Sequence, residues 1–94
     1  MELGGVRLDN NIREVTKDGA ALQLTYKEFE LLMYLMRHKS IAVSRDKLME
    51  MVWGYEFAGE TRTVDMHIKT LRQKLEAAGC TDLIKTVRGI GYKI

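Results

Sequence analysis

The sequence is poor in the residue types that build cross-links and metal sites. Its 94 residues include one cysteine, Cys80, and two histidines, His38 and His67. A single cysteine excludes an internal disulfide, and a small domain without disulfides is typical of a reducing, cytosolic compartment. These three side chains are also too few for a structural zinc site, which has four ligands. We therefore expect no metal site, no cofactor and a cytoplasmic location.

Long apolar runs and low-complexity tracts are also absent. The longest apolar run is far shorter than the about 20 residues that a membrane-spanning helix needs. Residues 1–5 lack the basic and apolar regions of a secretory signal. The composition, 46% hydrophobic and 30% charged, excludes disorder and collagen. The length suits one domain, residues 1–94, that buries roughly 65% of its unfolded surface.

The charge is unevenly distributed along the chain. Residues 1–60 hold eight basic and ten acidic side chains, a net charge of −2. Residues 61–94 hold seven basic and three acidic side chains, a net charge of +4. This polarity indicates a polyanionic partner such as a nucleic acid, although a solvated basic face explains it equally well.

The first quarter of the chain is predicted to form short antiparallel strands. Apolar and polar residues alternate over 6–8, 13–16 and 22–24, and residues around Leu3 suit a further strand. Lys17-Asp18-Gly19 favours a hairpin turn, because Asp-Gly tolerates the positive φ angles of a tight turn.

Two helices are predicted next. Thr25 and Glu28 have capping-box spacing at the start of the first helix, and Ser44 caps the second, which ends near Trp53-Gly54. Helical periodicity places on the buried faces Phe29, Leu31, Leu32, Met33, Leu35, Met36, Leu48, Met51 and Val52. A stretch from Gly54 to Glu60 then interrupts the helical pattern.

The third helix is predicted over residues 62–78, with Thr61 as its cap and Gly79 as its stop. At about 100° per residue, one stripe contains Val64, Ile68, Leu71, Leu75 and Ala78. Opposite this stripe lie Arg62, Met66, Lys69 and Gln73, flanked by Thr63, His67 and Thr70. Such a face suits the DNA major groove, but an ordinary solvated helix face has the same composition. We expect Asp65 to be structural and to pair with Arg62 or Arg72.

The last segment, residues 84–94, reads as a β-hairpin with a glycine-rich tip at 88–91. Three helices followed by a hairpin is the layout of a winged helix-turn-helix, in which the third helix enters the major groove. Arg88 at the tip of the hairpin then suits the narrow minor groove, where the negative potential attracts arginine.

Four sequence blocks, in order, resemble the effector domain of OmpR/PhoB-type response regulators. They are LTYKEFELL at 24–32, VWG at 52–54, RTVDMHI with LRQKL at 62–75, and TVRGIGY at 86–92. The resemblance covers nearly the whole chain. It implies an α+β winged helix-turn-helix with an N-terminal four-stranded antiparallel sheet, three helices and a C-terminal β-hairpin wing.

The resemblance also implies residue roles. The major-groove set is Arg62, Thr63, Met66, His67, Lys69, Thr70 and Gln73. Positions that touch phosphates match Trp53, Arg72, Thr86 and Tyr92, and the minor-groove position matches Arg88. The loop through which relatives contact RNA polymerase, by its sigma or alpha subunit, matches Gly54, Tyr55, Glu56, Phe57, Ala58, Gly59 and Glu60. Tyr26 replaces a common proline, and Thr70 replaces a common arginine.

The implied function is sequence-specific binding of double-stranded DNA, as the output domain of a two-component regulator of transcription. The resemblance implies two copies on direct-repeat half-sites and a preceding receiver domain, which this chain lacks. The isolated domain is expected to be monomeric off DNA and to contact no membrane.

Two other function classes compete with DNA binding. A winged-helix module for protein–protein contact would use the loop at 54–60, with its two aromatic side chains. An enzyme is disfavoured, because the sequence places no paired carboxylates, nucleophile–base pair or metal set on one predicted surface. We therefore expect no catalytic residues.

Overall fold

The computed structural model describes residues 1–57 and 59–94. Its first part is the four-stranded antiparallel sheet that the sequence predicts, in the order β1-β2-β3-β4. The strands are β1 (Glu2–Leu3), β2 (Val6–Asp9), β3 (Glu14–Lys17) and β4 (Ala20–Leu22). Alternation in β2 and β3 puts Val6, Leu8 and Val15 into the core, because successive side chains of a strand point to opposite faces.

Helix α1 (Tyr26–Arg37) begins with the predicted capping box. The Thr25 hydroxyl accepts a hydrogen bond from the Glu28 backbone amide at 3.2 Å, and the Glu28 carboxylate accepts one from the Thr25 backbone amide at 2.8 Å. These two bonds satisfy amides that a helix start leaves without intrahelical partners. All six apolar residues predicted for the buried face of α1 are buried.

The second helix differs from the prediction in its second half. Helix α2 (Arg45–Leu48) is capped by Ser44 as expected, but a π-helical turn continues it over Met49–Trp53. The Gly54 amide donates to the Met49 carbonyl five residues earlier. This wider turn shifts the phase of the side chains. The prediction that Met51 faces inward is therefore wrong, because its side chain is exposed and Met49 takes the buried place.

Helix α3 (Arg62–Ala77) buries four residues of the predicted stripe, Val64, Ile68, Leu71 and Leu75. The fifth, Ala78, is the C-cap residue and is only half-buried. Thr61 is the N-cap residue of α3, as predicted, but it has helical angles and its side chain makes no capping bond. Instead, the Thr63 amide donates to the Glu60 carbonyl.

The C-terminal end of α3 follows the prediction. Gly79 adopts a φ of +90°, and its amide donates to the carbonyl of Glu76. The Cys80 amide donates to the carbonyl of Leu75, which completes a Schellman motif.

The C-terminal hairpin belongs to a second sheet that the sequence did not predict. Its strands β6 (Lys85–Val87) and β7 (Gly91–Lys93) are joined by β5 (Val43–Ser44), in the order β5-β7-β6. At Gly91 an added Cβ would lie 2.1 Å from the Val43 carbonyl oxygen. The close approach of β5 and β7 therefore requires glycine there.

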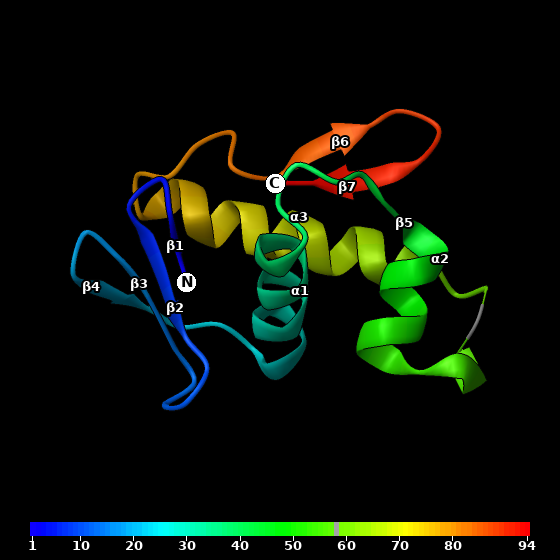
Figure 1. Cartoon of the computed structure of the whole chain (residues 1–94), viewed down its shortest axis with the longest axis horizontal. Helices are drawn as coiled ribbons and strands as arrows, with labels where there is room; N and C mark the ends of the chain where they lie inside the picture. Colours follow the sequence, from blue (N-terminus) through cyan, green and yellow to red (C-terminus); the bar gives the residue numbers. More distant parts are fainter. Residues whose placement is uncertain (58) are drawn as a thin grey trace.

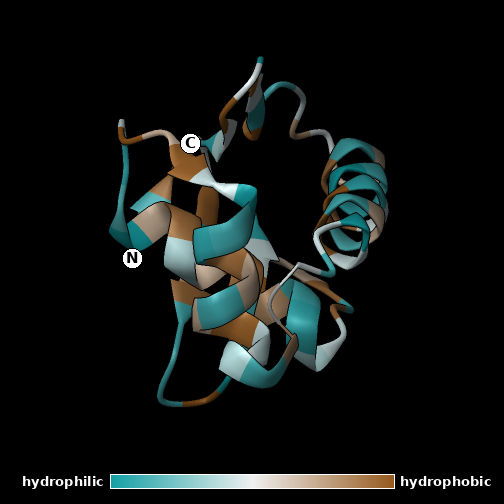
Figure 2. Cartoon of the chain, turned by 90° about the vertical axis from the view of Figure 1, so that its right-hand side faces the viewer, coloured by the Kyte–Doolittle hydropathy of each residue, from teal (hydrophilic) through white to brown (hydrophobic). Residues whose placement is uncertain are grey.

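Helix α3 runs through the centre of the molecule (Figure 1). The N-terminal sheet lies at its C-terminal end, α2 lies near its N-terminal end, and the β6–β7 hairpin extends beside it. Apolar segments of the helices and strands turn toward the interior, and hydrophilic segments turn outward (Figure 2). In the described residues, no helix combines the length and the apolar character needed to cross a membrane.

The buried stripe of α3 generates a stability prediction. Leu71 is fully buried, whereas Gln73 is exposed two positions later. Leu71→Ala should lower the free energy of unfolding by about 2–5 kcal/mol through lost apolar contact and a cavity. Gln73→Ala should change it by less than about 0.5 kcal/mol. Thermal or urea unfolding of both variants measures this, and a destabilised Gln73→Ala beside an unaffected Leu71→Ala would contradict the orientation of α3.

Candidate nucleic-acid interface

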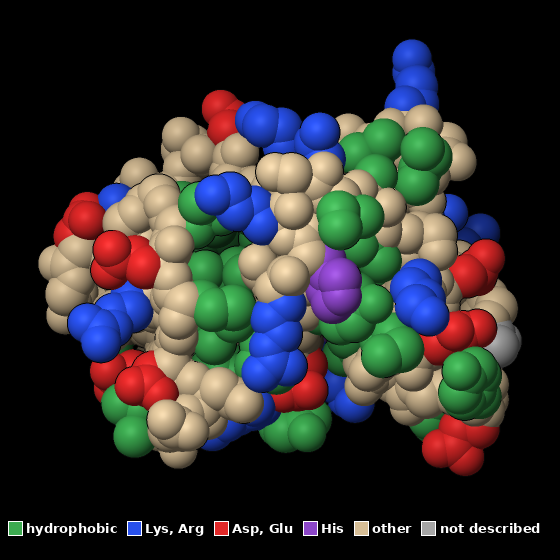
Figure 3. All heavy atoms as spheres, in the orientation of Figure 1, with side chains coloured by type: hydrophobic (Ala, Val, Ile, Leu, Met, Phe, Trp, Pro, Cys, Tyr) green, Lys and Arg blue, Asp and Glu red, His purple; other side chains and the backbone are tan. Residues whose placement is uncertain are grey.

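The face of α3 opposite its buried stripe is open to solvent. The residues predicted to enter a groove divide into exposed and half-buried side chains. The exposed ones are Arg62, Met66, Lys69, Thr70 and Gln73, and the half-buried ones are Thr63 and His67. In the space-filling view, basic side chains run across the middle of the face shown and project from the β6–β7 hairpin (Figure 3). Most acidic side chains in that view lie toward its two ends.

A buried carboxylate fixes α3 against α1. Glu28 is only 2% exposed, and its side chain accepts hydrogen bonds from two α3 residues one turn apart. The Thr70 hydroxyl donates at 2.6 Å and the Lys74 ammonium at 2.6 Å. Thr70, predicted to face the groove, therefore also bonds to α1. Sequence reasoning identified Glu28 only as a cap, because its α3 partners lie more than 40 residues further along the chain.

The ionisation of Glu28 reflects these contacts. Burial raises the pKa of a carboxyl group, but the hydrogen bonds from Lys74, Thr70 and the Thr25 amide outweigh burial here. The pKa of Glu28 is lowered to about 2. Glu28 is thus a charged group at neutral pH, and it holds α1 and α3 in one arrangement.

Trp53 and His67 meet beside the exposed face of α3. Their ring centroids lie 5.0 Å apart in an edge-to-face arrangement, and the Lys27 ammonium lies 5.4 Å from the centre of the Trp53 ring. The His67 Nδ1 is 2.8 Å from the Thr63 carbonyl oxygen, which can only accept, so Nδ1 donates. The sequence did not link Lys27 to this group.

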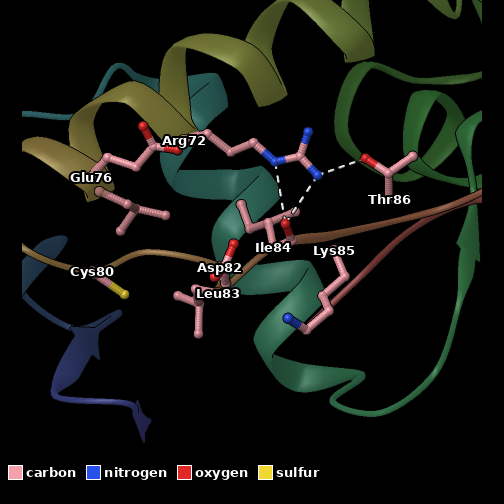
Figure 4. A pocket seen from close by; sticks show the side chains of 9 residues that line it. Arg72, Glu76, Cys80, Asp82, Leu83, Ile84, Lys85 and Thr86 are labelled. Atoms are coloured by element: carbon pink, nitrogen blue, oxygen red, sulfur yellow. Dashed lines mark hydrogen bonds between the residues drawn. The ribbon is translucent and has the colours of Figure 1, made fainter.

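Arg72, predicted to contact a phosphate, is bound to the start of the wing. Its guanidinium donates to the Ile84 carbonyl at 2.9 Å and to the Thr86 hydroxyl at 2.7 Å (Figure 4). Two of the predicted phosphate positions, Arg72 and Thr86, therefore lie in direct contact. Some of the N–H donors of Arg72 are therefore already hydrogen-bonded to protein groups.

Asp65 pairs with a partner that the sequence did not indicate. It forms a two-bond ion pair with Arg45 at the start of α2, and the Tyr92 hydroxyl donates to it at 2.6 Å. The expected pairing with Arg62 or Arg72 is therefore wrong. Arg45 lies 20 positions before Asp65, so no helical spacing connects the two residues.

This cluster sets the ionisation of its members. Burial raises the pKa of Asp65, but the bonds from Arg45 and Tyr92 outweigh it and lower that pKa below its ordinary value. Burial, and then the bond to Asp65, raise the pKa of Tyr92 to about 12. The Tyr92 ring is buried and its hydroxyl is engaged, so this predicted phosphate position is also part of the internal structure.

The wing tip and most described residues of the loop at 54–60 are exposed. Arg88 and Ile90 are exposed at the tip, where Gly89 adopts a φ of +76°. In the loop, a 3₁₀ turn spans Tyr55–Phe57 and both of its aromatic side chains are exposed. Ala58, predicted to be part of the polymerase-contact loop, lies outside the described residues.

The geometry offers binding groups rather than reactive ones. In the described part of the chain, no group of three or more His, Cys, Asp or Glu side chains could hold a metal ion. Cys80 lines the hollow beside Arg72 and Ile84 (Figure 4). Burial raises the pKa of its thiol and so disfavours the nucleophilic thiolate.

The comparison with protein families identifies the family of this chain. The model of the family described as "Transcriptional regulatory protein, C terminal" matches residues 19–94. The chain belongs to this family. Its members are the DNA-binding effector domains of OmpR/PhoB-type response regulators in two-component systems, and they regulate transcription rather than act as enzymes. The winged-helix architecture predicted from the sequence is thereby confirmed.

The effector domain has close relatives in sequence and in structure. It is 45% identical over its whole length to the transcriptional regulatory protein TrcR of Mycobacterium tuberculosis, of which it spans 36%. The response regulator AdeR DNA-binding domain, solved in complex with an intercistronic region, matches it with a TM-score of 0.91 and 26% identity, covering 100% of this chain and 97% of the solved AdeR domain. The RstA DNA-binding domain of Klebsiella pneumoniae, solved in complex with the RstA box, gives a TM-score of 0.88 and 33% identity, covering 100% and 94%.

The low pKa of Glu28 generates a pH prediction for this effector domain. Its ordinary pKa is 4.5, so the unfolded chain binds the proton more tightly than the folded one. The stabilisation is therefore fully present above pH 4.5 and is lost as the pH falls toward 2. Its size is on the order of 3 kcal/mol.

Glu28→Gln should remove most of this pH dependence from the free energy of unfolding, measured by urea unfolding between pH 2 and 6. Glu76→Gln, which alters an exposed carboxylate on α3, is the matched control and should keep the wild-type dependence. An unchanged slope in Glu28→Gln would contradict the assignment.

Proposed function

We propose that the effector domain binds a specific duplex by placing α3 in the major groove and the wing at the minor groove. The observation that carries this proposal is the division of α3. One stripe is buried, and the opposite side exposes cationic, hydroxyl and amide side chains that can meet base edges and phosphates. The net charge of +4 over residues 61–94 supports a polyanionic partner.

Each part of the interface has a distinct role in this proposal. Base edges are contacted by the groove-facing surface of α3: Arg62, Thr63, Met66, His67, Lys69, Thr70 and Gln73. Phosphates are contacted by Trp53, Arg72, Thr86 and Tyr92, and Arg88 at the wing tip enters the minor groove. Several of these side chains also have partners inside the protein, which orients them before DNA arrives.

The proposal extends to the larger assembly. We propose that two copies occupy direct-repeat half-sites, that a receiver domain of the full-length protein controls this pairing, and that the isolated domain is a monomer off DNA. Because the partner is chromosomal DNA, we place the domain in the cytoplasm. The exposed aromatic side chains of Tyr55 and Phe57 support a contact between the loop at 54–60 and RNA polymerase, by its sigma or alpha subunit.

A protein–protein module is the second candidate function, because the same loop exposes apolar surface. Tyr55 is 77% exposed and Phe57 is 40% exposed. The two functions are compatible in one domain, but they differ in their response to salt. Contacts with phosphates release counterions and weaken steeply as salt rises, whereas an apolar contact does not.

We expect DNA binding to weaken steeply with salt. Selecting bound sites from a random duplex pool gives the target, and titrating that duplex between low and physiological salt gives the slope. Each phosphate neutralised should contribute a slope of about −0.9 in log affinity against log salt concentration. A flat response would contradict the proposal that phosphate contacts dominate.

Lys69→Ala and Arg88→Ala should weaken binding in different ways. Lys69 is exposed on the groove-facing surface of α3, so its loss should lower affinity on every flanking sequence. Arg88 is at the wing tip, so its loss should reduce the preference for A·T-rich flanks, where the minor groove is narrow. Titration on duplexes with A·T-rich and G·C-rich flanks measures both effects. Equal losses for Arg88→Ala on the two flanks would remove its minor-groove role.

A further inference from the structure

The wing is fastened to α3 by a chain of three side chains from three elements. The Tyr92 hydroxyl of β7 donates a hydrogen bond to the Asp65 carboxylate of α3 at 2.6 Å. The Arg45 guanidinium of α2 donates two hydrogen bonds to the same carboxylate. Tyr92 faces Val43 of β5 and Thr86 of β6 in the sheet register. The Tyr92 hydroxyl therefore connects β7, the middle strand of the β5-β7-β6 sheet, to α3.

A second fastening lies two turns further along α3. Arg72, seven positions after Asp65, donates to the Ile84 carbonyl and the Thr86 hydroxyl at the start of the wing. Residues seven apart lie on nearly the same side of a helix, about 10 Å apart along its axis. The Arg72 guanidinium also lies 5.4 Å from the centre of the Tyr92 ring. Asp65 thus anchors β7, whereas Arg72 anchors β6.

The charge of Asp65 works against the proposed partner. An ionised carboxylate on the helix that enters a groove repels phosphates, and its side chain is 38% exposed. Arg45 offsets that charge locally by its two-bond contact. A carboxylate in this position therefore contributes through the bonds that it accepts from Tyr92 and Arg45, rather than through contact with DNA.

We propose that Asp65 is a positioning residue, which fixes the place of the wing tip relative to the groove-facing surface of α3 by holding the Tyr92 hydroxyl. Its consequence for binding, that Arg88 reaches the minor groove while α3 fills the major groove, rests on the proposed function. The hydroxyl stays protonated and the carboxylate stays ionised at neutral pH, because the pKa of Tyr92 is raised and that of Asp65 is lowered.

The first test measures the wing position without DNA. Spin labels at Glu76→Cys on α3 and Ile90→Cys at the wing tip, in a Cys80→Ala background, report the distance between α3 and the tip by pulsed electron resonance. Both labelled positions are exposed. Tyr92→Phe removes only the hydroxyl and should broaden or shift this distance distribution. Tyr26→Phe, an exposed tyrosine at the start of α1, is the matched control and should leave it unchanged.

Variants at Asp65 separate its hydrogen bonding from its charge. Asp65→Ala removes the acceptor and should change the distance distribution as Tyr92→Phe does. Asp65→Asn keeps a carbonyl acceptor for the Tyr92 hydroxyl and should restore much of the wild-type distribution. Thermal unfolding establishes that each variant is folded, and Tyr92→Phe alone decides the matter if Asp65→Ala is not.

The second test connects the wing position to DNA. Tyr92→Phe should reduce the preference for A·T-rich over G·C-rich flanks by about threefold, the size of a typical modest coupling. In an Arg88→Ala background, Tyr92→Phe should cause no further loss of that preference, because the positioned group is gone. Loss of a Tyr92 phosphate contact would instead weaken binding equally on both flanks.

The outcomes separate the two proposals. A Tyr92→Phe distance distribution that superimposes on the wild-type one overturns the positioning role, as does an Asp65→Asn variant that behaves like Asp65→Ala. A changed distribution together with an unchanged flank preference in Arg88→Ala supports the positioning role and rejects the minor-groove role of Arg88.

Discussion

The burial of one stripe of α3 determines which side chains of this helix face solvent. Val64, Ile68, Leu71 and Leu75 are almost completely buried, so rotation of the helix about its axis would expose apolar surface. The opposite face is therefore directed outward by the core, whatever its own residues prefer. Because α3 runs through the centre of the molecule, α1, α2, the N-terminal sheet and the wing all take their positions around it (Figure 1).

Polar side chains fix what apolar packing leaves free. Hydrophobic contact sets which side of a helix is buried, but it is tolerant of small sliding movements. Glu28 bonds α1 to α3, Arg72 bonds α3 to Thr86 in the first wing strand, and Lys27 donates to the Val52 carbonyl in the π-helical turn. Among the described residues, no buried side-chain nitrogen or oxygen lacks a hydrogen-bond partner. These directional bonds give the interface a defined geometry.

The sequence predicted the parts of the molecule that depend on neighbours close along the chain. The capping box of Thr25 and Glu28, the buried stripe of α3 and the glycine stop at Gly79 are all set within one or two helical turns. Periodicity also identified which face of α3 is exposed. The family resemblance then connected these elements to the winged helix and to DNA.

The remaining features depend on residues that are distant in sequence. Strand β5 has only two residues, and it forms because Val43 meets Tyr92 almost fifty positions later. The partner of Asp65 is Arg45, on another helix, rather than a residue at helical spacing. Met51 is exposed because a π-helical turn changes the phase of the helix, and no periodic pattern assumes such a turn. The internal partners of predicted site residues such as Thr70 and Tyr92 could not be recognised without the packed structure.

The wing sheet is closely constrained at its base and open at its tip. Gly91 has no room for a side chain against the Val43 carbonyl, whereas Arg88, Gly89 and Ile90 project into solvent. Side chains at 88 and 90 can therefore be exchanged at little cost to folding, while the strands beneath them resist change. The hairpin thus separates exposed positions, which tolerate exchange, from the strands that preserve the fold, so side chains at the tip can change while the backbone that carries them stays in place.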